Sequence, residues 1–339
     1  MEGATNLRPS NTRIAVVTGG NKGIGLEVCR QLATGGGVTV LLTARDETRG
    51  EAAVEKLREA GLSGDVIFHQ LEITDDPSIA RLAEFLRARF GKLDILINNA
   101  AVGAGEYVQD PSDSSATEEK VRFTCIFGFS EIIDEKLVYS MLSACVQQLR
   151  GLDQRQRLEV MFSGVRETYD AAREGIKTNY YGTKNVIEAL LPLLKASSDG
   201  RIVNVSSEFG LLRLINNEEL KLELDDAEKL TEERLDELLA AYLRDFAAGE
   251  VEARGWPLYF SAYKVSKVML NAYTRILARR HPELRINCAH PGYAHTDMTI
   301  QTGPLTPQEG ASNLVKVALL PEGGPTGAYF AMGEEAPFV

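Results

Sequence analysis

The sequence predicts an α/β fold, a doubly wound parallel sheet of about seven strands. Three observations predict it: apolar runs alternate with helical patterns, the first run ends in a glycine-rich turn, and the rhythm resumes after two irregular stretches. Strands joined by crossover helices form parallel sheets that are covered on both faces. Because 339 residues with 44% hydrophobic side chains can bury a large core, we expect one domain over residues 1–339.

The first hundred residues follow this rhythm without interruption. Asp46 and Asp76 stand where side chains cap helix N-termini, immediately before or within the first turn of a helical pattern. The expected elements, alternately strand and helix, are 14–18, 23–33, 38–43, 46–60, 66–73, 77–90 and 93–97.

Two segments then break the alternation. Residues 104–161 begin with an acidic, serine-rich stretch and continue into a mixed apolar one, whereas residues 211–258 are strongly charged, with a helix expected to start at Thr231. We interpret both as insertions near the active site, the second one lid-like. The regular elements expected around them are helix 165–194, strand 201–206, helix 262–280, strand 285–289 and strand 327–331.

Bulk composition excludes several classes of protein. A formal net charge of -11 argues against non-specific binding to nucleic acid or to an anionic membrane. No apolar run is long enough for a spanning helix, and residues 1–12 lack the apolar stretch of a secretory signal, so we expect a cytoplasmic protein. Four scattered cysteines and four histidines predict free thiols and no metal site.

A glycine-rich turn, Thr18-Gly19-Gly20-Asn21-Lys22-Gly23-Ile24-Gly25, separates the first expected strand from the first expected helix. Glycines permit a tight turn, and the free N–H groups of the helix N-terminus attract a pyrophosphate. The strand before it and the helix after it make this turn a dinucleotide site and the fold Rossmann-type. The residues expected to contact the cofactor here are Gly19, Asn21, Lys22, Gly23, Ile24 and Gly25.

The end of the second strand indicates which dinucleotide is bound. An NAD site commonly places an acidic side chain there for the ribose 2′-hydroxyl, but this strand ends Thr43-Ala44-Arg45. Arg45 and Lys22 are two cations that could hold a 2′-phosphate, which favours NADP(H).

Tyr263 and Lys267 lie four residues apart in an expected helix, and therefore share one face. Such a pair is common by chance, so it indicates a functional site only together with other motifs. Polar or glycine-containing motifs follow the fourth, fifth and sixth strands at 98–101, 203–207 and 291–296, and Asn179 lies in the helix between. The carboxyl ends of parallel strands are where ligands bind in open α/β sheets.

In order and context, these motifs resemble the short-chain dehydrogenase/reductase family over nearly the whole chain, and the TGxxxGxG spacing resembles its classical members. The resemblance implies that Tyr263 is the general acid for carbonyl reduction. Lys267 would lower the pKa of Tyr263 and hold the nicotinamide ribose. Ser207, rather than Ser206, would bind the carbonyl oxygen, and Asn179 would hold a water that connects Lys267 to solvent.

The resemblance also implies further cofactor contacts. Glu72 and Ile73 match a pair beside the adenine, although the family usually has a shorter acid at the first position. Other contacts would come from the segments after the fourth and sixth strands, namely Asn99, Ala100, Pro291, Gly292, Ala294 and Thr296.

The long spacing between Ser207 and Tyr263 resembles the plant salutaridine reductase and menthone/neomenthol reductase-like subgroup. That subgroup implies a monomer in which the segment before the catalytic tyrosine folds over the active site. We therefore hypothesise an apolar substrate wall formed by Leu211, Leu212, Trp256, Tyr259, Phe260 and Tyr293. No chemistry can be assigned to insertion 104–161.

The resulting expectation is an NADPH-dependent carbonyl reductase that acts reversibly on a hydrophobic ketone or aldehyde. An enone double-bond reductase is a second hypothesis. A non-catalytic NADP(H)-binding sensor is a third, which the apparently complete set of catalytic residues disfavours. Terpenoid ketones, alkaloid ketones and reactive aldehydes all remain open as substrates.

Overall fold

The structure is a computed structural model that describes residues 12–62, 64–107, 123–124, 165–299 and 301–339. Its centre is an eight-stranded sheet in which every neighbouring pair is parallel except the last. The strands are β1 (Arg13–Val17), β2 (Val38–Ala44), β3 (Val66–Gln70), β4 (Ile95–Asn98), β8 (Arg201–Val205), β9 (Arg285–His290), β10 (Tyr329–Ala331) and β11 (Glu334–Ala336). Their order is β11-β10-β9-β8-β4-β1-β2-β3.

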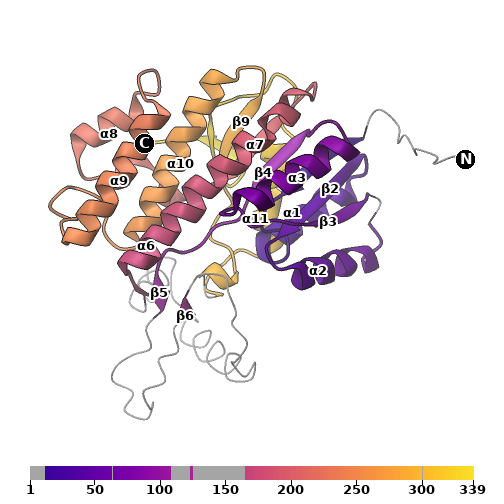
Figure 1. The fold of residues 1–339 in the computed structure, drawn as a ribbon, viewed down its shortest axis with the longest axis horizontal. Coiled ribbons are helices and arrows are strands. Elements are labelled where there is room, and N and C mark those ends of the chain that lie inside the picture. Colours follow the sequence, from indigo (N-terminus) through magenta and orange to yellow (C-terminus); the bar gives the residue numbers. More distant parts are fainter. Residues whose placement is uncertain (1–11, 63, 108–122, 125–164, 300) are drawn as a thin grey trace, which may run out of the picture.

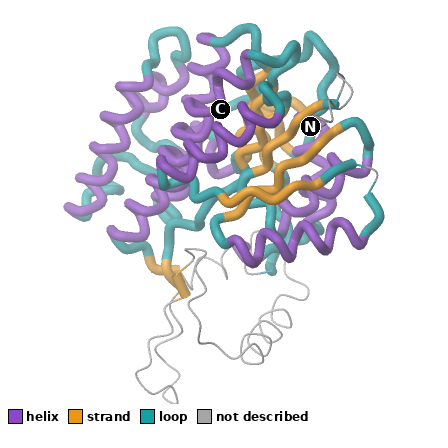
Figure 2. Tube along the Cα trace, turned by 45° about the vertical axis from the view of Figure 1, so that its right-hand side comes forward, coloured by secondary structure: helices purple, strands orange, loops and turns teal. Residues whose placement is uncertain are grey.

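Helices cover both faces of the sheet, which confirms the doubly wound prediction (Figure 2). On one face pack α1 (Gly23–Thr34), α2 (Glu47–Glu59) and α11 (Pro307–Ala318); on the other pack α3 (Asp76–Arg89), α7 (Thr183–Lys195) and α10 (Ser261–Arg280). A hydrophobic core lies on each face of the sheet, and successive side chains of a strand point into the two cores in turn. Val16 and Leu96 belong to one core, and Val17 and Ile97 belong to the other. β2 and β3 follow β1 on one side of the sheet, whereas β4 and the later strands lie on the other side of β1. Open α/β sheets bind ligands at such a switch point in the strand order, here between β1 and β4.

Local capping sets several helix starts. The Asp46 carboxylate accepts the Arg49 N–H at the start of α2, as predicted. For α3 the prediction is wrong by one residue, because Asp75 rather than Asp76 accepts the Ser78 N–H at 3.0 Å. Both carboxylates also lie where the helix dipole favours negative charge.

The long helix predicted over 165–194 is divided. Its first residues form β7 (Val165–Arg166), and Thr168 then caps α6 (Tyr169–Ile176), which a π-helical turn over Lys177–Gly182 joins to α7. β7 pairs with β5 (Glu106–Tyr107), and β5 also pairs with β6 (Phe123–Thr124). This three-stranded sheet was not predicted, and most of insertion 104–161 lies outside the described residues.

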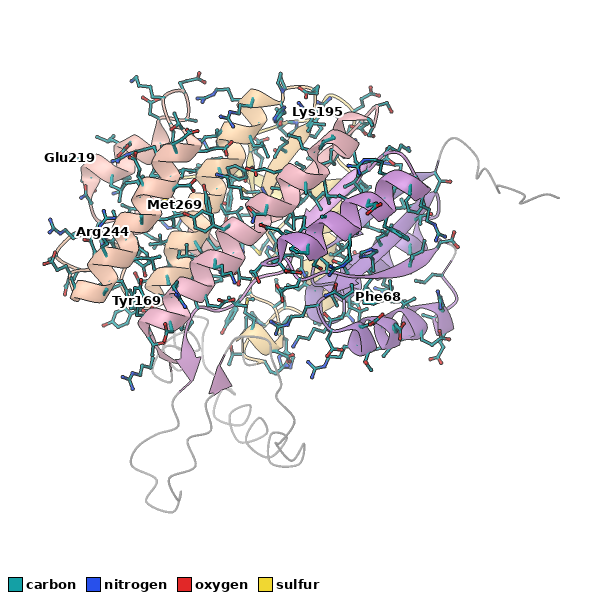
Figure 3. The ribbon with its side chains drawn as sticks, viewed as in Figure 1. Phe68, Tyr169, Lys195, Glu219, Arg244 and Met269 are labelled. Atoms are coloured by element: carbon teal, nitrogen blue, oxygen red, sulfur yellow. The ribbon has the colours of Figure 1, made fainter. Side chains whose placement is uncertain are left out.

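The second insertion forms α8 (Glu218–Asp225) and α9 (Glu232–Ala248), which lie beside α10 at the side of the molecule away from β2 and β3 (Figure 1). The helix predicted to start at Thr231 begins one residue later, because Thr231 is the N-cap of α9. The inward faces of these helices are apolar and join the core of α7 and α10. Glu219 and Arg244 lie at the outer margin of the two helices, whereas Met269 of α10 lies in the interior (Figure 3).

Candidate active site

A cavity of about 490 Å³ lies at the carboxyl ends of β1, β2, β4, β8 and β9. Its volume is in the range of small-molecule and cofactor sites. Every residue predicted to contact the cofactor lines it, and so does Ser207. Asn179 is the one predicted site residue that does not line the cavity.

The glycine-rich turn is shaped by close backbone approach. Gly19 has a φ of 64°, a conformation that side chains disfavour. A Cβ on Gly25 would lie 2.4 Å from the Gly19 carbonyl oxygen and 2.5 Å from Asn99 Nδ2. Asn99 Nδ2 donates to the carbonyl oxygens of Thr18 and Gly19 at 2.9 and 3.1 Å, while the Thr18 hydroxyl accepts the N–H groups of Asn99 and Ala100. The turn is thus fixed to the end of β4, with room above the N-terminus of α1 for a pyrophosphate.

Cations gather where β2 ends. Arg45 lines the cavity, and so does Arg49, which was not predicted although it lies four residues later in the first turn of α2. Lys22 lines the cavity too, but its Nζ lies 2.6 Å from a carboxylate oxygen of Asp297, in the loop after β9. This ion pair connects the glycine-rich turn to the loop that closes the cavity on the opposite side.

α10 presents Tyr263 and Lys267 one turn apart, as the spacing predicted. Lys267 is buried; its Nζ donates to the Val205 carbonyl oxygen at 2.7 Å and lies 5.7 Å from the centroid of the Tyr263 ring. The Ser207 side chain lies close enough to the Tyr263 hydroxyl to lower the pKa of that hydroxyl. The Ser206 hydroxyl instead donates to Asn271 Oδ1 at 2.6 Å. Of the two adjacent serines, therefore, Ser207 is the one paired with the tyrosine.

Burial dominates the acidity of both α10 residues. It raises the pKa of Tyr263 to about 12, and the hydrogen bond with Ser207 acts in the opposite direction. It lowers the pKa of Lys267 to about 8. The expected lowering of the Tyr263 pKa by Lys267 is therefore wrong for this structure, in which the ammonium donates to a backbone carbonyl beneath the ring and desolvation of the phenolate prevails. Tyr263 keeps its proton at neutral pH, as a proton donor must.

Asn179 connects three parts of the site. Its Oδ1 accepts the Val102 N–H at 2.8 Å, and its Nδ2 donates to the Val102 carbonyl oxygen at 3.0 Å and to Ser266 Oγ at 3.1 Å. The side chain is buried, and it joins the π-helical turn to the loop after β4 and to α10. π-Helical turns are frequent at functional sites.

This geometry can be compared with that of known proteins. A short chain dehydrogenase family model matches residues 13–137. A curated relative, short-chain dehydrogenase/reductase 1 of Saponaria officinalis, is 45% identical over 328 residues, covering 96% of this chain and 96% of the relative. The chain belongs to the short-chain dehydrogenase/reductase family.

Two solved structures of this family resemble the enzyme throughout. Salutaridine reductase from Papaver somniferum has a TM-score of 0.78 and 40% identity, covering 94% of this chain and 99% of that one. Menthone neomenthol reductase from Mentha piperita has a TM-score of 0.73 and 39% identity, covering 96% and 100%. Carbonyl reductase [NADPH] 3 of Mus musculus is a more distant relative, 36% identical and covering 92% of each chain. The predicted subgroup is confirmed by these likenesses.

The wall of the cavity differs from the prediction. Phe260 and Tyr293 line it, but Leu211, Leu212, Trp256 and Tyr259 do not. The two leucines and the tryptophan are buried in the core, whereas Tyr259 is 72% exposed. Within residues 211–258, all of them described, none lines the cavity, because α8 and α9 pack beside α10 rather than across the cavity mouth.

Sequence reasoning missed an aromatic residue at the centre of this wall. The Phe209 ring packs edge-on against Tyr263, with centroids 6.4 Å apart. Its position two residues after Ser207 was an available signal, because a segment that follows a strand at the carboxyl edge of a parallel sheet borders the ligand site. His290 at the end of β9 also lines the cavity, and burial lowers its pKa to about 4, so its imidazole is neutral.

Proposed function

We propose that the enzyme is an NADP(H)-dependent carbonyl reductase that converts a hydrophobic ketone or aldehyde to the alcohol, with Tyr263 as proton donor. The observation that carries this proposal is that Ser207, Tyr263 and Lys267 line the same cavity as the glycine-rich turn, with the Ser207 side chain close enough to the Tyr263 hydroxyl to influence its pKa. The printed names of the relatives support it, since they include salutaridine reductase, menthone neomenthol reductase and carbonyl reductase [NADPH] 3.

The residues present fit a phosphorylated dinucleotide. The absence of a side chain at Gly25 lets the Gly19 carbonyl and the Asn99 side chain pack against the start of α1, which holds the glycine-rich turn beside the helix N-terminus where a pyrophosphate would bind. Arg45 and Arg49 lie where a 2′-phosphate would be held, and β2 ends without an acid that would select the free 2′-hydroxyl. When bound, the nicotinamide supplies or accepts the hydride.

The protein's own part in the reaction is hydrogen bonding and proton transfer. Ser207 and Tyr263 line the same cavity, where the hydroxyls of both can donate to a carbonyl oxygen and stabilise the charge that develops on it. Tyr263, protonated at neutral pH, then gives its proton to the alkoxide. Lys267, whose Nζ lies 5.7 Å from the centroid of the Tyr263 ring, is expected to hold the nicotinamide ribose, and Asn179 is expected to support the water that returns a proton.

The substrate side of the cavity favours an apolar molecule. Phe209, Phe260, Tyr293 and Met298 line it around Tyr263. An apolar wall with a few polar groups converging on one atom is typical of sites for small hydrophobic ligands. This arrangement supports a bulky hydrophobic ketone or aldehyde as the substrate class.

The two adjacent serines provide a matched test. We expect Ser207→Ala to lower kcat by about 100-fold, the usual effect of removing one donor at a developing oxyanion. Ser206→Ala should lower stability, through loss of the bond to Asn271, but leave kcat within a fewfold of the wild type. Tyr263→Phe should lose most activity and retain NADPH binding. The idea fails if Ser207→Ala is as active as Ser206→Ala.

Product analysis decides between the enzymatic hypotheses. Wild-type enzyme and NADPH should turn a hydrophobic enone into the allylic alcohol. The saturated ketone as sole product would favour double-bond reduction instead. NADPH binding with no turnover on menthone-like ketones, alkaloid ketones or short aldehydes would favour the sensor.

We also propose that the enzyme is a monomer. None of the helices in the described ranges is long and apolar enough to cross a membrane. What supports a monomer is that α9 packs on α6 and α10, so that the outer apolar surface of these helices is covered within one chain. Light scattering coupled to size-exclusion chromatography tests the monomer, and a dimer mass at micromolar concentration would contradict it.

A further inference from the structure

The N-terminal end of the catalytic helix α10 has an unusual local structure. The two residues before it, Tyr259 and Phe260, have φ angles of 54° and 52°, in the left-handed region that residues with side chains rarely adopt. Phe260 occupies the N-cap position, yet its side chain makes no capping hydrogen bond and instead lines the cavity. The N–H groups of the first turn therefore need an acceptor from elsewhere in the chain.

Glu167 supplies this acceptor from a different element. It lies between β7 and α6, and its Oε1 accepts the Ala262 N–H at 3.2 Å. Burial raises the pKa of the Glu167 carboxyl, and the backbone N–H groups of Ala262, Ser261 and Phe260 act in the opposite direction. A carboxylate that faces the N–H groups of a helix start is favoured by both hydrogen bonding and the helix dipole.

A lysine completes the arrangement on the other side of the turn. Lys264 Nζ donates to the Leu258 carbonyl oxygen at 2.7 Å and attracts the Glu167 carboxylate electrostatically. The same Nζ lies 5.5 Å from the centroid of the Phe209 ring, which packs edge-on against Tyr263. Both charged groups are partly buried, so removing either one leaves the other without its compensating charge in a poorly solvated place.

We infer that Glu167 is a positioning residue for carbonyl reduction. Through the backbone of the first turn of α10, it sets the orientation of Phe260 in the substrate wall and of Tyr263 at the reacting centre. Lys264 is its partner in this role. The inference rests on the proposed function, because it assigns Glu167 to the reaction that Tyr263 performs.

The test compares Glu167→Ala and Glu167→Gln with the loss of a helix cap away from the cavity. Thr231 is that control: its hydroxyl accepts the Arg234 N–H at 3.2 Å at the start of α9, which does not line the cavity. We expect kcat to fall about tenfold or more in Glu167→Ala, as one charge-assisted hydrogen bond allows, and less in Glu167→Gln. The Kd for NADPH should stay within about twofold, since its contacts lie on other elements.

Thr231→Ala should lower the Tm without changing kcat. Hydrogen exchange in residues 259–265 should become faster in both Glu167 variants and stay unchanged in Thr231→Ala. Glu167→Gln keeps the test possible if Glu167→Ala does not fold. A kcat equal to that of the wild type in Glu167→Gln and Glu167→Ala would overturn the inference, as would a fall in kcat matched by an equal loss of NADPH affinity.

The partnership with Lys264 has its own measurement. Glu167→Gln combined with Lys264→Met removes both charges, so the double variant should be no less active than the weaker single variant. If the fall in kcat of the double variant equalled the product of the falls in the two single variants, the residues would act independently and the partnership would be overturned. Failure of the proposed function looks different: the wild type itself would then bind NADPH and reduce no carbonyl compound.

Discussion

Gly25 offers a sharp test of the cofactor site, because the space for its side chain is already filled. In Gly25→Ala, the new Cβ would lie 2.4 Å from the Gly19 carbonyl oxygen and 2.5 Å from Asn99 Nδ2. The backbone oxygen cannot move alone, since it belongs to the turn that Asn99 holds through bonds to Thr18 and Gly19. We expect a displaced turn and the loss of at least one of these bonds.

The size of the effect follows from these contacts. Overpacking a tight site costs about 1–3 kcal/mol, and each lost hydrogen bond adds about 1 kcal/mol. Unfolding in urea should therefore show a destabilisation of about 2–4 kcal/mol, from the same two terms. Because the displaced backbone is the surface that meets the pyrophosphate, the Kd for NADPH, measured by fluorescence titration, should rise by about tenfold or more.

The same helix provides the control. Gly35 ends α1 with a φ of -70° and has no atom within 4 Å of its Cβ position. Gly35→Ala should therefore leave the Kd unchanged and alter stability by less than about 1 kcal/mol, in the stabilising direction. If Gly25→Ala bound NADPH with the wild-type Kd, the assignment of the glycine-rich turn to the cofactor would be refuted.

Three further changes test the charges and the packing around the site. Asp297→Asn should release Lys22 for the cofactor phosphates and lower the Kd for NADPH by about two- to fivefold at low salt; a raised Kd would contradict this. Lys267 has a lowered pKa of about 8, so kcat/KM for reduction should fall as the pH rises through that value, and a flat profile from pH 7 to 9 would count against it. Burial of the charged Lys267 side chain destabilises the folded state, which is why its pKa is lower there than in the unfolded chain. Lys267→Met should therefore raise the free energy of unfolding at pH 7, as measured by urea unfolding, while abolishing most activity. Trp256→Phe, which loses a bond to Asp245 and packing on Tyr242, should lower the Tm but leave the KM for a bulky ketone unchanged.

The fold was predictable where local patterns decide the structure. Apolar runs predicted the central strands, helical patterns predicted the helices between them, and Asp46 caps α2 as expected. The failures involve pairing between distant segments. β11 is short and acidic, and it is a strand only because it reverses onto β10; β5, β6 and β7 likewise depend on one another. The π-helical turn could not be predicted from helical periodicity, which it shares with the helices on either side.

The site was predictable to the extent that topology dictates it. In a parallel sheet all carboxyl ends lie on one edge, so motifs at strand ends had to meet there, and they line one cavity. Packing decided the rest. Ser206 and Ser207 are adjacent in sequence, but only a partner such as Asn271 determines which hydroxyl is free for chemistry. Glu167 lies far from Tyr263 in the chain and belongs to no pattern that could have connected the two.

The second insertion, residues 211–258, packs as a support for α10 rather than across the cavity. α9 is held to the core by its acidic first turn, in which Glu232 pairs with Arg280 and, at 3.2 Å, with Lys184. Arg275 of α10 similarly donates to the Asp225 carbonyl oxygen, at the end of α8. The second insertion thus supports the outer face of α10 while Glu167, beyond the first insertion, holds its N-terminal turn.

This arrangement decides which experiment can identify the substrate wall. Deleting residues 217–255 would expose the apolar side of α10 and inactivate the enzyme through loss of stability, so a lost activity would say nothing about substrate contacts. Phe260→Ala leaves α8 and α9 in place and changes the cavity directly. We expect it to raise the KM for a bulky ketone by about tenfold, from lost burial of one aromatic ring, with little change for a short aldehyde. Equal changes for both substrates would mean that Phe260 acts only by holding the start of α10.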